Sequence, residues 1–122
     1  MPSLPHNHSN NIEDIISRLP NTEDFLLLSD IFRQLSDQNR TRIFWLLCHC
    51  EECVINLSAL MDMSSPAVSH HLKQLKSAGL ITSRRSGKEV YYKAADTETS
   101  RALHNMIEEL MAITCPETCQ FK

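Results

Sequence analysis

Residues 64–79 read SSPAVSHHLKQLKSAG, and this segment has a marked start and a marked end. Ser65 belongs to the residue types that cap helix N-termini, and Pro66 suits the first helical position, where the missing N–H costs no hydrogen bond. Gly79 favours a helix end because it tolerates the left-handed backbone found there. The pattern predicts a helix over Pro66–Ala78, whose apolar stripe consists of Val68, Leu72 and Leu75.

The opposite face of this helix is polar. Its hydroxyl, imidazole, ammonium and amide groups are those that reach phosphates and base edges in a DNA major groove. The candidate DNA contacts are Ser65, Ser69, His70, Lys73, Gln74 and Lys76. Upstream, Asn56–Met61 reads as a short helix capped by Asn56, followed by a tight turn over residues 62–64. This order predicts a helix-turn-helix with Pro66–Ala78 as the recognition helix.

Residues 80–93 predict a β-hairpin. The strands are Leu80–Arg85 and Lys88–Lys93, joined by the two-residue turn Ser86-Gly87. The tip is basic and adds three candidate DNA contacts, Arg84, Arg85 and Lys88. Residues 66–93 hold six Lys or Arg against one acid, although the whole chain has a net charge of −3. Because DNA responds to the local field of the docking face, the acidic remainder does not argue against DNA binding.

These motifs resemble the ArsR/SmtB family of winged-helix repressors. The resemblance rests on residues 65–81, on Arg85-x-Gly87-Lys88-x-Val90-Tyr91-Tyr92 and on Asp37-x-x-Arg40-x-Arg42-Ile43. It implies a mainly α winged helix-turn-helix with a small β-hairpin wing. It also implies a homodimer, formed through the first and last helices, that represses transcription from a double-stranded DNA operator.

Length and composition agree with that class. A chain of 122 residues with 42% apolar residues and two Gly is expected to form one mostly helical globular domain. It has no apolar run near eighteen residues and no basic-then-apolar leader, so we expect a cytoplasmic protein rather than a membrane-bound or secreted one. No phosphate-cradling Gly loop or catalytic triad is present, so an enzyme is not expected.

The chain divides into three parts. Residues 1–20 are expected to be a flexible arm with a short helix over Asn11–Leu19. Residues 21–114 form the winged helix-turn-helix domain, which starts with helices over Thr22–Leu35 and Gln38–Leu47 and ends with a dimerisation helix over 97–114. Residues 115–122 form a tail that contains Cys.

Cys48-His49-Cys50-Glu51-Glu52-Cys53 is the densest group of soft ligands. Thiolates prefer zinc, cadmium, lead, copper(I) or arsenite to hard cations, so Cys48, Cys50 and Cys53 are candidate metal ligands. The resembled family often has Cys-x-Cys here, but Ile55 occupies the second position of that pair, with Cys48 and Cys50 as the nearest substitutes. Further candidates are His6, His8, Cys115 and Cys119.

The last helix, predicted over Asp96–Thr114, is amphipathic. Since it follows the wing, we expect no place for it in the core of a single winged helix, and its apolar face predicts a partner chain. The expected interface residues are Leu103, Met106, Ile107, Leu110 and Met111. Asp96 is either the N-cap of this helix or a ligand. The resemblance implies a second metal site here, with candidates Asp96, Glu98, His104 and Glu109; His104 could instead join Asp96 or Glu108.

Three functions remain open at this point. The first is a repressor released from its operator by zinc, cadmium, lead or arsenite. The second is a repressor of the same fold released by oxidation or persulfidation of its Cys residues. The third is a constitutive DNA-binding module without an inducer, in which the Cys residues are small buried side chains or idle thiols.

Overall fold

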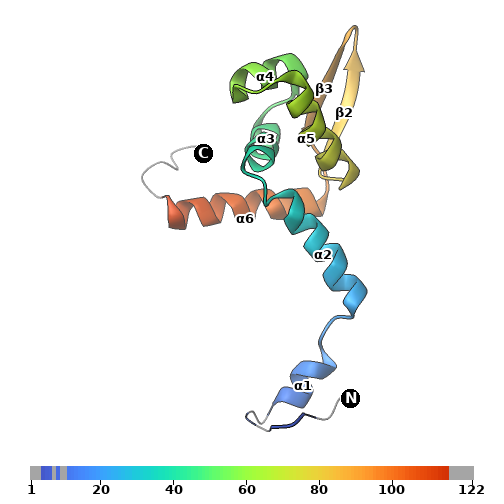
Figure 1. The fold of residues 1–122 in the computed structure, drawn as a ribbon, viewed down its shortest axis with the longest axis vertical. Coiled ribbons are helices and arrows are strands. Elements are labelled where there is room, and N and C mark those ends of the chain that lie inside the picture. Colours follow the sequence, from blue (N-terminus) through green and yellow to red (C-terminus); the bar gives the residue numbers. More distant parts are fainter. Residues whose placement is uncertain (1–3, 7, 9–10, 116–122) are drawn as a thin grey trace.

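The computed structural model describes residues 4–6, 8 and 11–115. The elements in chain order are α1 (Ile12–Ser17), α2 (Thr22–Gln34), α3 (Gln38–His49), β1 (Glu52–Cys53), α4 (Val54–Met61), α5 (Ser65–Ser77), β2 (Ile81–Ser86), β3 (Glu89–Ala94) and α6 (Glu98–Thr114). In Figure 1, α3, α4, α5 and the sheet form the body, α6 crosses beneath it, and α2 and α1 extend away. The predicted mainly helical fold with a hairpin wing is confirmed.

The predicted recognition helix is α5, and it begins one residue early. Ser64, not Ser65, is the N-cap, and its Oγ accepts a hydrogen bond from the Ala67 N–H at 3.3 Å. Pro66 therefore stands at the second helical position, whose N–H would also lack a partner within the helix. At the far end Gly79 adopts a φ of +77°, as its identity predicted.

The helix-turn-helix is confirmed, with a shifted first helix. α4 begins at Val54 and its N-cap position is Cys53, so the prediction that Asn56 caps this helix is wrong. Asp62 then takes a left-handed φ of 53°, and the Ser58 hydroxyl donates to the Met63 carbonyl across the turn. This turn places α5 against α4.

The sheet has a strand that the sequence did not predict. Its order is β1-β3-β2, and all pairs are antiparallel. The β2–β3 register pairs Ser86 with Glu89, so the turn is Gly87-Lys88, one residue later than predicted. β1 pairs Cys53 with Tyr91. A strand of two residues has no readable periodicity, and the thiols of this segment were interpreted as ligands.

One core holds the winged helix together. Its fully buried side chains come from α3, α4, α5 and the start of β2, and α6 adds Leu103 and Ile107, which are 6% and 7% exposed. The expectation that α6 has no place in the core of a single chain is therefore wrong, since these two residues are buried without a partner chain. Met106 packs against the same core, whereas Leu110 and Met111 are exposed.

The start of α6 is fixed by Ser100. Its buried hydroxyl donates to the Leu80 carbonyl at 2.9 Å, which ties α6 to the segment between α5 and β2. Thr97 is the N-cap, with its Oγ accepting from the Ser100 N–H at 3.2 Å. Asp96 therefore does not cap the helix; its carboxylate pairs with Arg101 at 2.5 Å.

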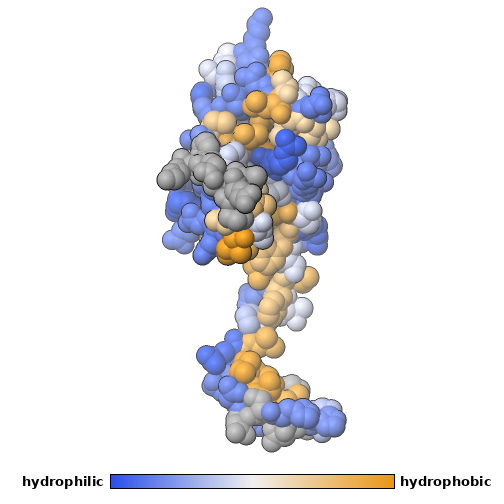
Figure 2. Space-filling model, turned by 90° about the vertical axis from the view of Figure 1, so that its left-hand side faces the viewer, coloured by the Kyte–Doolittle hydropathy of each residue, from blue (hydrophilic) through white to orange (hydrophobic). Residues whose placement is uncertain are grey.

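A long apolar surface has no partner among the described residues. Every α2 residue from 22 to 30 is exposed, and Figure 2 shows apolar side chains along this helix. The exposed apolar side chains of α2 and α6 are Phe25, Leu26, Leu27, Leu28, Phe32, Leu110, Met111 and Ile113. Among the described residues, no helix is both long and apolar enough to cross a membrane.

Candidate functional site

The predicted DNA-reading face of α5 is open to solvent. Ser65, Ser69, His70 and Lys73 are exposed and Gln74 is half-buried, while the apolar stripe on the other side of the helix lies in the core. Figure 1 shows α5 beside the β2–β3 hairpin. Lys76 is already engaged, because its Nζ donates to Ser83 Oγ at 2.6 Å and links α5 to β2.

The three predicted cations at the wing tip differ in their contacts. Arg85 and Lys88 are exposed, and within the described residues their side chains form no hydrogen bond or ion pair. Arg84, in contrast, binds Glu51 through two hydrogen bonds, from Nε at 2.9 Å and from Nη2 at 2.6 Å, and lies over the Tyr91 ring. This pairing lowers the pKa of the Glu51 carboxyl and raises that of Arg84. The guanidinium of Arg84 is thus already paired with a carboxylate of its own chain.

A polar group lies between the middle of α5 and the corner that joins α2 to α3. The His71 Nε2 lies 3.9 Å from an Asp37 carboxylate oxygen, and burial lowers the pKa of His71. Asp37 caps α3 by accepting the Arg40 N–H at 2.9 Å, which lowers the pKa of the carboxyl. The Arg40 side chain donates to the carbonyls of Gln34 and Arg33, so it fixes the α2–α3 corner.

The structure does not gather the three thiols predicted as ligands. Cys53 is buried in the sheet, and Cys50 is exposed with its Sγ donating to the Leu46 carbonyl at 3.2 Å. Cys48 packs against the core, where burial, aided by the Glu108 charge, raises its pKa to about 12. Within the described residues, no group of three ligand atoms that includes a thiol lies within 4.8 Å.

A different set of three ligand atoms does converge. The Nε2 atoms of His49 and His104 lie 3.1 Å apart, and they lie 3.2 Å and 3.0 Å from Glu108 Oε1. Among the described residues, this His49–His104–Glu108 cluster is the group of three metal-ligand side chains whose ligand atoms all lie within 4.8 Å of one another. It joins the last turn of α3 to the middle of α6.

Helical spacing builds this cluster. His104 and Glu108 are four residues apart on α6, and Trp45 and His49 are four apart on α3, so each helix presents one pair to the other. The Trp45 Nε1–H donates to the same Glu108 oxygen at 3.0 Å. Burial acts to raise the pKa of the Glu108 carboxyl, but hydrogen bonds from His49, Trp45 and His104 outweigh it and lower that pKa.

Most other predicted ligands lie outside the cluster. His104 belongs to it, as one of the alternatives expected, but Asp96 is paired with Arg101, and Glu98 and Glu109 are exposed. In the N-terminal arm the His6 and His8 rings stack on each other, with centroids 5.3 Å apart. Cys115 is exposed at the end of α6, and Cys119 lies outside the described residues. Sequence reasoning missed His49 because its neighbours are thiols.

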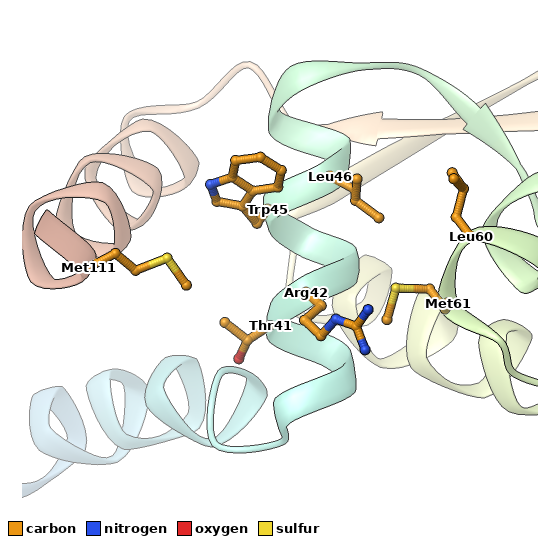
Figure 3. Close-up of a pocket in the computed structure, with 7 residues that line it drawn as sticks. All are labelled: Thr41, Arg42, Trp45, Leu46, Leu60, Met61 and Met111. Carbon is orange, nitrogen blue, oxygen red and sulfur yellow. The ribbon is translucent and has the colours of Figure 1, made fainter. Parts of the chain in front are cut away.

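Trp45 also borders an apolar hollow of about 360 Å³. In Figure 3 its indole stands between α3 and α6, with Met111 on one side and Leu46, Leu60 and Met61 across the hollow. Thr41 and Arg42 complete the lining. The same indole therefore contacts the hollow with its rings and the His49–His104–Glu108 cluster with its N–H.

A helix-turn-helix with an exposed polar recognition helix and a basic wing beside it defines a winged helix-turn-helix DNA-binding regulator. Residues 37–83 match the family model described as "Bacterial regulatory protein, arsR family". The chain is 38% identical over 86 residues to the cadmium resistance transcriptional regulatory protein CadC of Listeria innocua. The aligned residues cover 70% of this chain and 71% of that protein. The chain belongs to the arsR family of bacterial regulatory proteins.

Two further comparisons agree. The transcriptional repressor SmtB homolog of Synechocystis is 36% identical over 83 residues, which span 68% of this chain and 63% of that protein. The structure of HlyU from Vibrio cholerae superimposes with a TM-score of 0.66 at 26% identity, covering 78% of this chain and 99% of that one. The fold and family are those of DNA-binding regulators and not of enzymes, as the sequence predicted.

Proposed function

We propose that this chain is a homodimeric transcriptional repressor that a metal or metalloid ion releases from a DNA operator. The observation that carries the proposal is the exposed polar face of α5 beside a basic wing, in a chain of the arsR family. The two parts of the proposal, docking and release, rest on different features of the molecule.

For docking, α5 enters the major groove and the wing contacts the flanking backbone. Ser65, Ser69 and His70 meet base edges near the start of the helix, and Gln74 meets them further along. Lys73, Arg85 and Lys88 neutralise phosphates. Lys76 and Arg84 contribute less than their charge suggests, because Ser83 and Glu51 already bind them.

The dimer explains the apolar surface of α2 and α6. Phe25, Leu28 and Phe32 on α2 and Leu110 on α6 are 44–51% exposed in one chain, which is costly unless a second chain covers them. A two-fold dimer would set two α5 helices about one DNA turn apart, and both half-sites are needed for tight binding.

For release, the names of the relatives indicate the class of inducer. CadC is named for cadmium resistance, and the Escherichia coli relative is named an arsenical resistance operon repressor. An ion that binds the low-affinity conformation better weakens DNA binding by the same factor. Release by oxidation is less well supported: Cys53 is buried, and burial raises the pKa of Cys48 to about 12 and also raises the pKa of the exposed Cys50, which suppresses the reactive thiolates.

The test starts from a duplex selected from random sequences. Binding of the reduced protein is followed by fluorescence anisotropy, alone and with zinc, cadmium or arsenite, at one ionic strength, with magnesium as the control ion. We expect sequence-selective binding that at least one of the three ions weakens about 5- to 150-fold, the usual range of allosteric coupling. Binding that ignores sequence would refute the docking part, and binding that ignores all three ions would refute the release part.

A further inference from the structure

We propose that His49, His104 and Glu108 bind one divalent cation of the zinc, cobalt or nickel class within a single chain. The ion would tie the end of α3 to the middle of α6. The inference rests on the proposed function, in which an ion is the inducer, and it states where that ion binds and what kind of ion it is.

The first support is the spacing of the three ligand atoms. Their separations of 3.0, 3.1 and 3.2 Å form a nearly equilateral triangle. Bonds of about 2.0–2.1 Å place ligand atoms about 3.4 Å apart around a tetrahedral ion and about 2.9 Å apart around an octahedral one. The observed triangle lies between these values, so an ion above its plane reaches all three atoms with small adjustments.

The second support is that the ligands are already held in place. The Trp45 Nε1–H binds the same Glu108 oxygen at 3.0 Å and orients the carboxylate, as partners of metal ligands do. The His49 ring lies between two others, 4.3 Å from the Trp45 centroid and 4.8 Å from that of His104. Trp45 is thus a positioning residue, and binding an ion requires little rearrangement of the side chains.

The third support is accessibility. The side chains of His49, His104 and Glu108 are 20%, 26% and 33% exposed, so solvent reaches the cluster. A second hollow of about 200 Å³, lined in part by Cys48, Asp96 and His104, opens beside it. An ion can enter this way and keep a water molecule at a fourth position.

Donor chemistry selects the class of ion. Two imidazole nitrogens and one carboxylate oxygen suit zinc, cobalt and nickel, whereas arsenite prefers several thiolates, and the cluster contains none, although Cys48 lines the neighbouring hollow. The position of the cluster gives binding a consequence. α3 contacts both α5 and α6, so an ion that joins α3 to α6 constrains the DNA-reading helix relative to the helix that carries part of the dimer surface.

The experiment is a cobalt titration of the full reduced chain, followed by visible absorption and equilibrium dialysis. His104→Gln and Glu108→Gln remove one ligand each and keep a polar side chain. Glu109→Gln is the matched control, because it removes an adjacent exposed carboxylate outside the cluster, and Cys50→Ser tests the most exposed thiol of the Cys48–Cys53 segment. Trp45 is the single tryptophan of the sequence, so its fluorescence reports binding independently.

For the wild type we expect one cobalt ion per chain and a change in Trp45 fluorescence. Both ligand variants should bind cobalt at least about 100-fold more weakly, since loss even of a hydrogen-bond partner of a metal ligand costs 10- to 100-fold in metal affinity. Glu109→Gln and Cys50→Ser should bind like the wild type. Trp45→Phe should weaken binding 10- to 100-fold without changing the stoichiometry. Equal circular dichroism and equal metal-free DNA affinity show that the variants are folded.

Unchanged affinity in His104→Gln, or an intense sulfur-to-cobalt charge-transfer band that Cys50→Ser removes, would overturn the site. So would a wild type that binds neither cobalt nor zinc at micromolar concentration. If the wild type still leaves DNA with cadmium or arsenite in that case, the proposed function stands and only the site fails. If cobalt binds at the cluster but leaves operator affinity unchanged, the site stands and its role as the inducer site is refuted.

Discussion

The ion pair between Arg84 and Glu51 predicts that two neighbouring wing cations contribute unequally to DNA binding. Each phosphate contact that is lost flattens the slope of log affinity against log salt by about 0.9, or about 3.5-fold in affinity between 50 and 200 mM salt. We expect this full effect for Lys88→Ala. Arg84→Ala should change the slope by much less, because Glu51 already neutralises Arg84 through two hydrogen bonds.

The opposite change should raise affinity. Glu51→Gln frees the Arg84 guanidinium, and we expect the salt slope to steepen by up to about 0.9 if that group then reaches a phosphate. Glu52→Gln is the matched control, since it removes the same charge one residue away without an Arg84 contact. The assay is anisotropy with the selected duplex at 50, 100 and 200 mM salt.

A double variant separates a released cation from a simple loss of negative charge. Arg84→Ala in the Glu51→Gln background should return the slope to that of Arg84→Ala alone. Two results would refute the reasoning: an Arg84→Ala effect as large as that of Lys88→Ala, or a Glu51→Gln slope no steeper than that of Glu52→Gln.

Three further outcomes follow from packing and burial. Ser100→Ala should lower the free energy of unfolding by about 0.5–1.5 kcal/mol, measured in urea, because the Leu80 carbonyl loses one of its two donors; no change would mean that the bond does not hold α6. Burial lowers the pKa of His71, so as pH falls below about 6.5 the unfolded chain takes up the proton first and the free energy of unfolding decreases. His71→Gln should reduce that decrease between about pH 7.5 and 5, above the range where the facing Asp37 titrates. An unchanged slope of unfolding free energy against pH would contradict this. Leu110→Asp should give a folded monomer by sedimentation, whereas Ile55→Asp, on an exposed position of α4 outside the α2–α6 surface, should stay dimeric; a dimeric Leu110→Asp would count against the interface.

The local features of this chain were readable from its sequence. The recognition helix and the wing follow from short-range signals, namely a Ser-Pro start, a Gly at the helix end and two apolar periodicities, and the structure moves their boundaries by about one residue. Such signals act over a few residues, and at α5 and the wing the distant contacts agree with them, whereas at α4 the predicted Asn56 cap failed beside the strand pairing of Cys53 with Tyr91.

Long-range contacts were not readable. His49 meets Glu108 across 59 residues and Arg84 meets Glu51 across 33, and neither pairing leaves a trace in local spacing. The thiols of Cys48 and Cys53 were predicted to meet because they are close in sequence. In the structure Cys53 lies in the short strand β1, and its side chain is buried in the core. Leu103 and Ile107 were predicted to be buried between subunits and are buried within one chain, because the amphipathic pattern of α6 does not say which chain covers its apolar face.

The exposed helix α2 has a consequence for how the molecule acquires its structure. Residues 22–30 are all exposed in the described part of the chain and Ile31 is the α2 side chain that packs against the core, and a thirteen-residue helix with so little packing is marginal in water. In the proposed dimer, contacts with the second subunit therefore stabilise this helix. Folding of this arm and pairing of the chains become a single equilibrium, in which the temperature of unfolding rises with protein concentration.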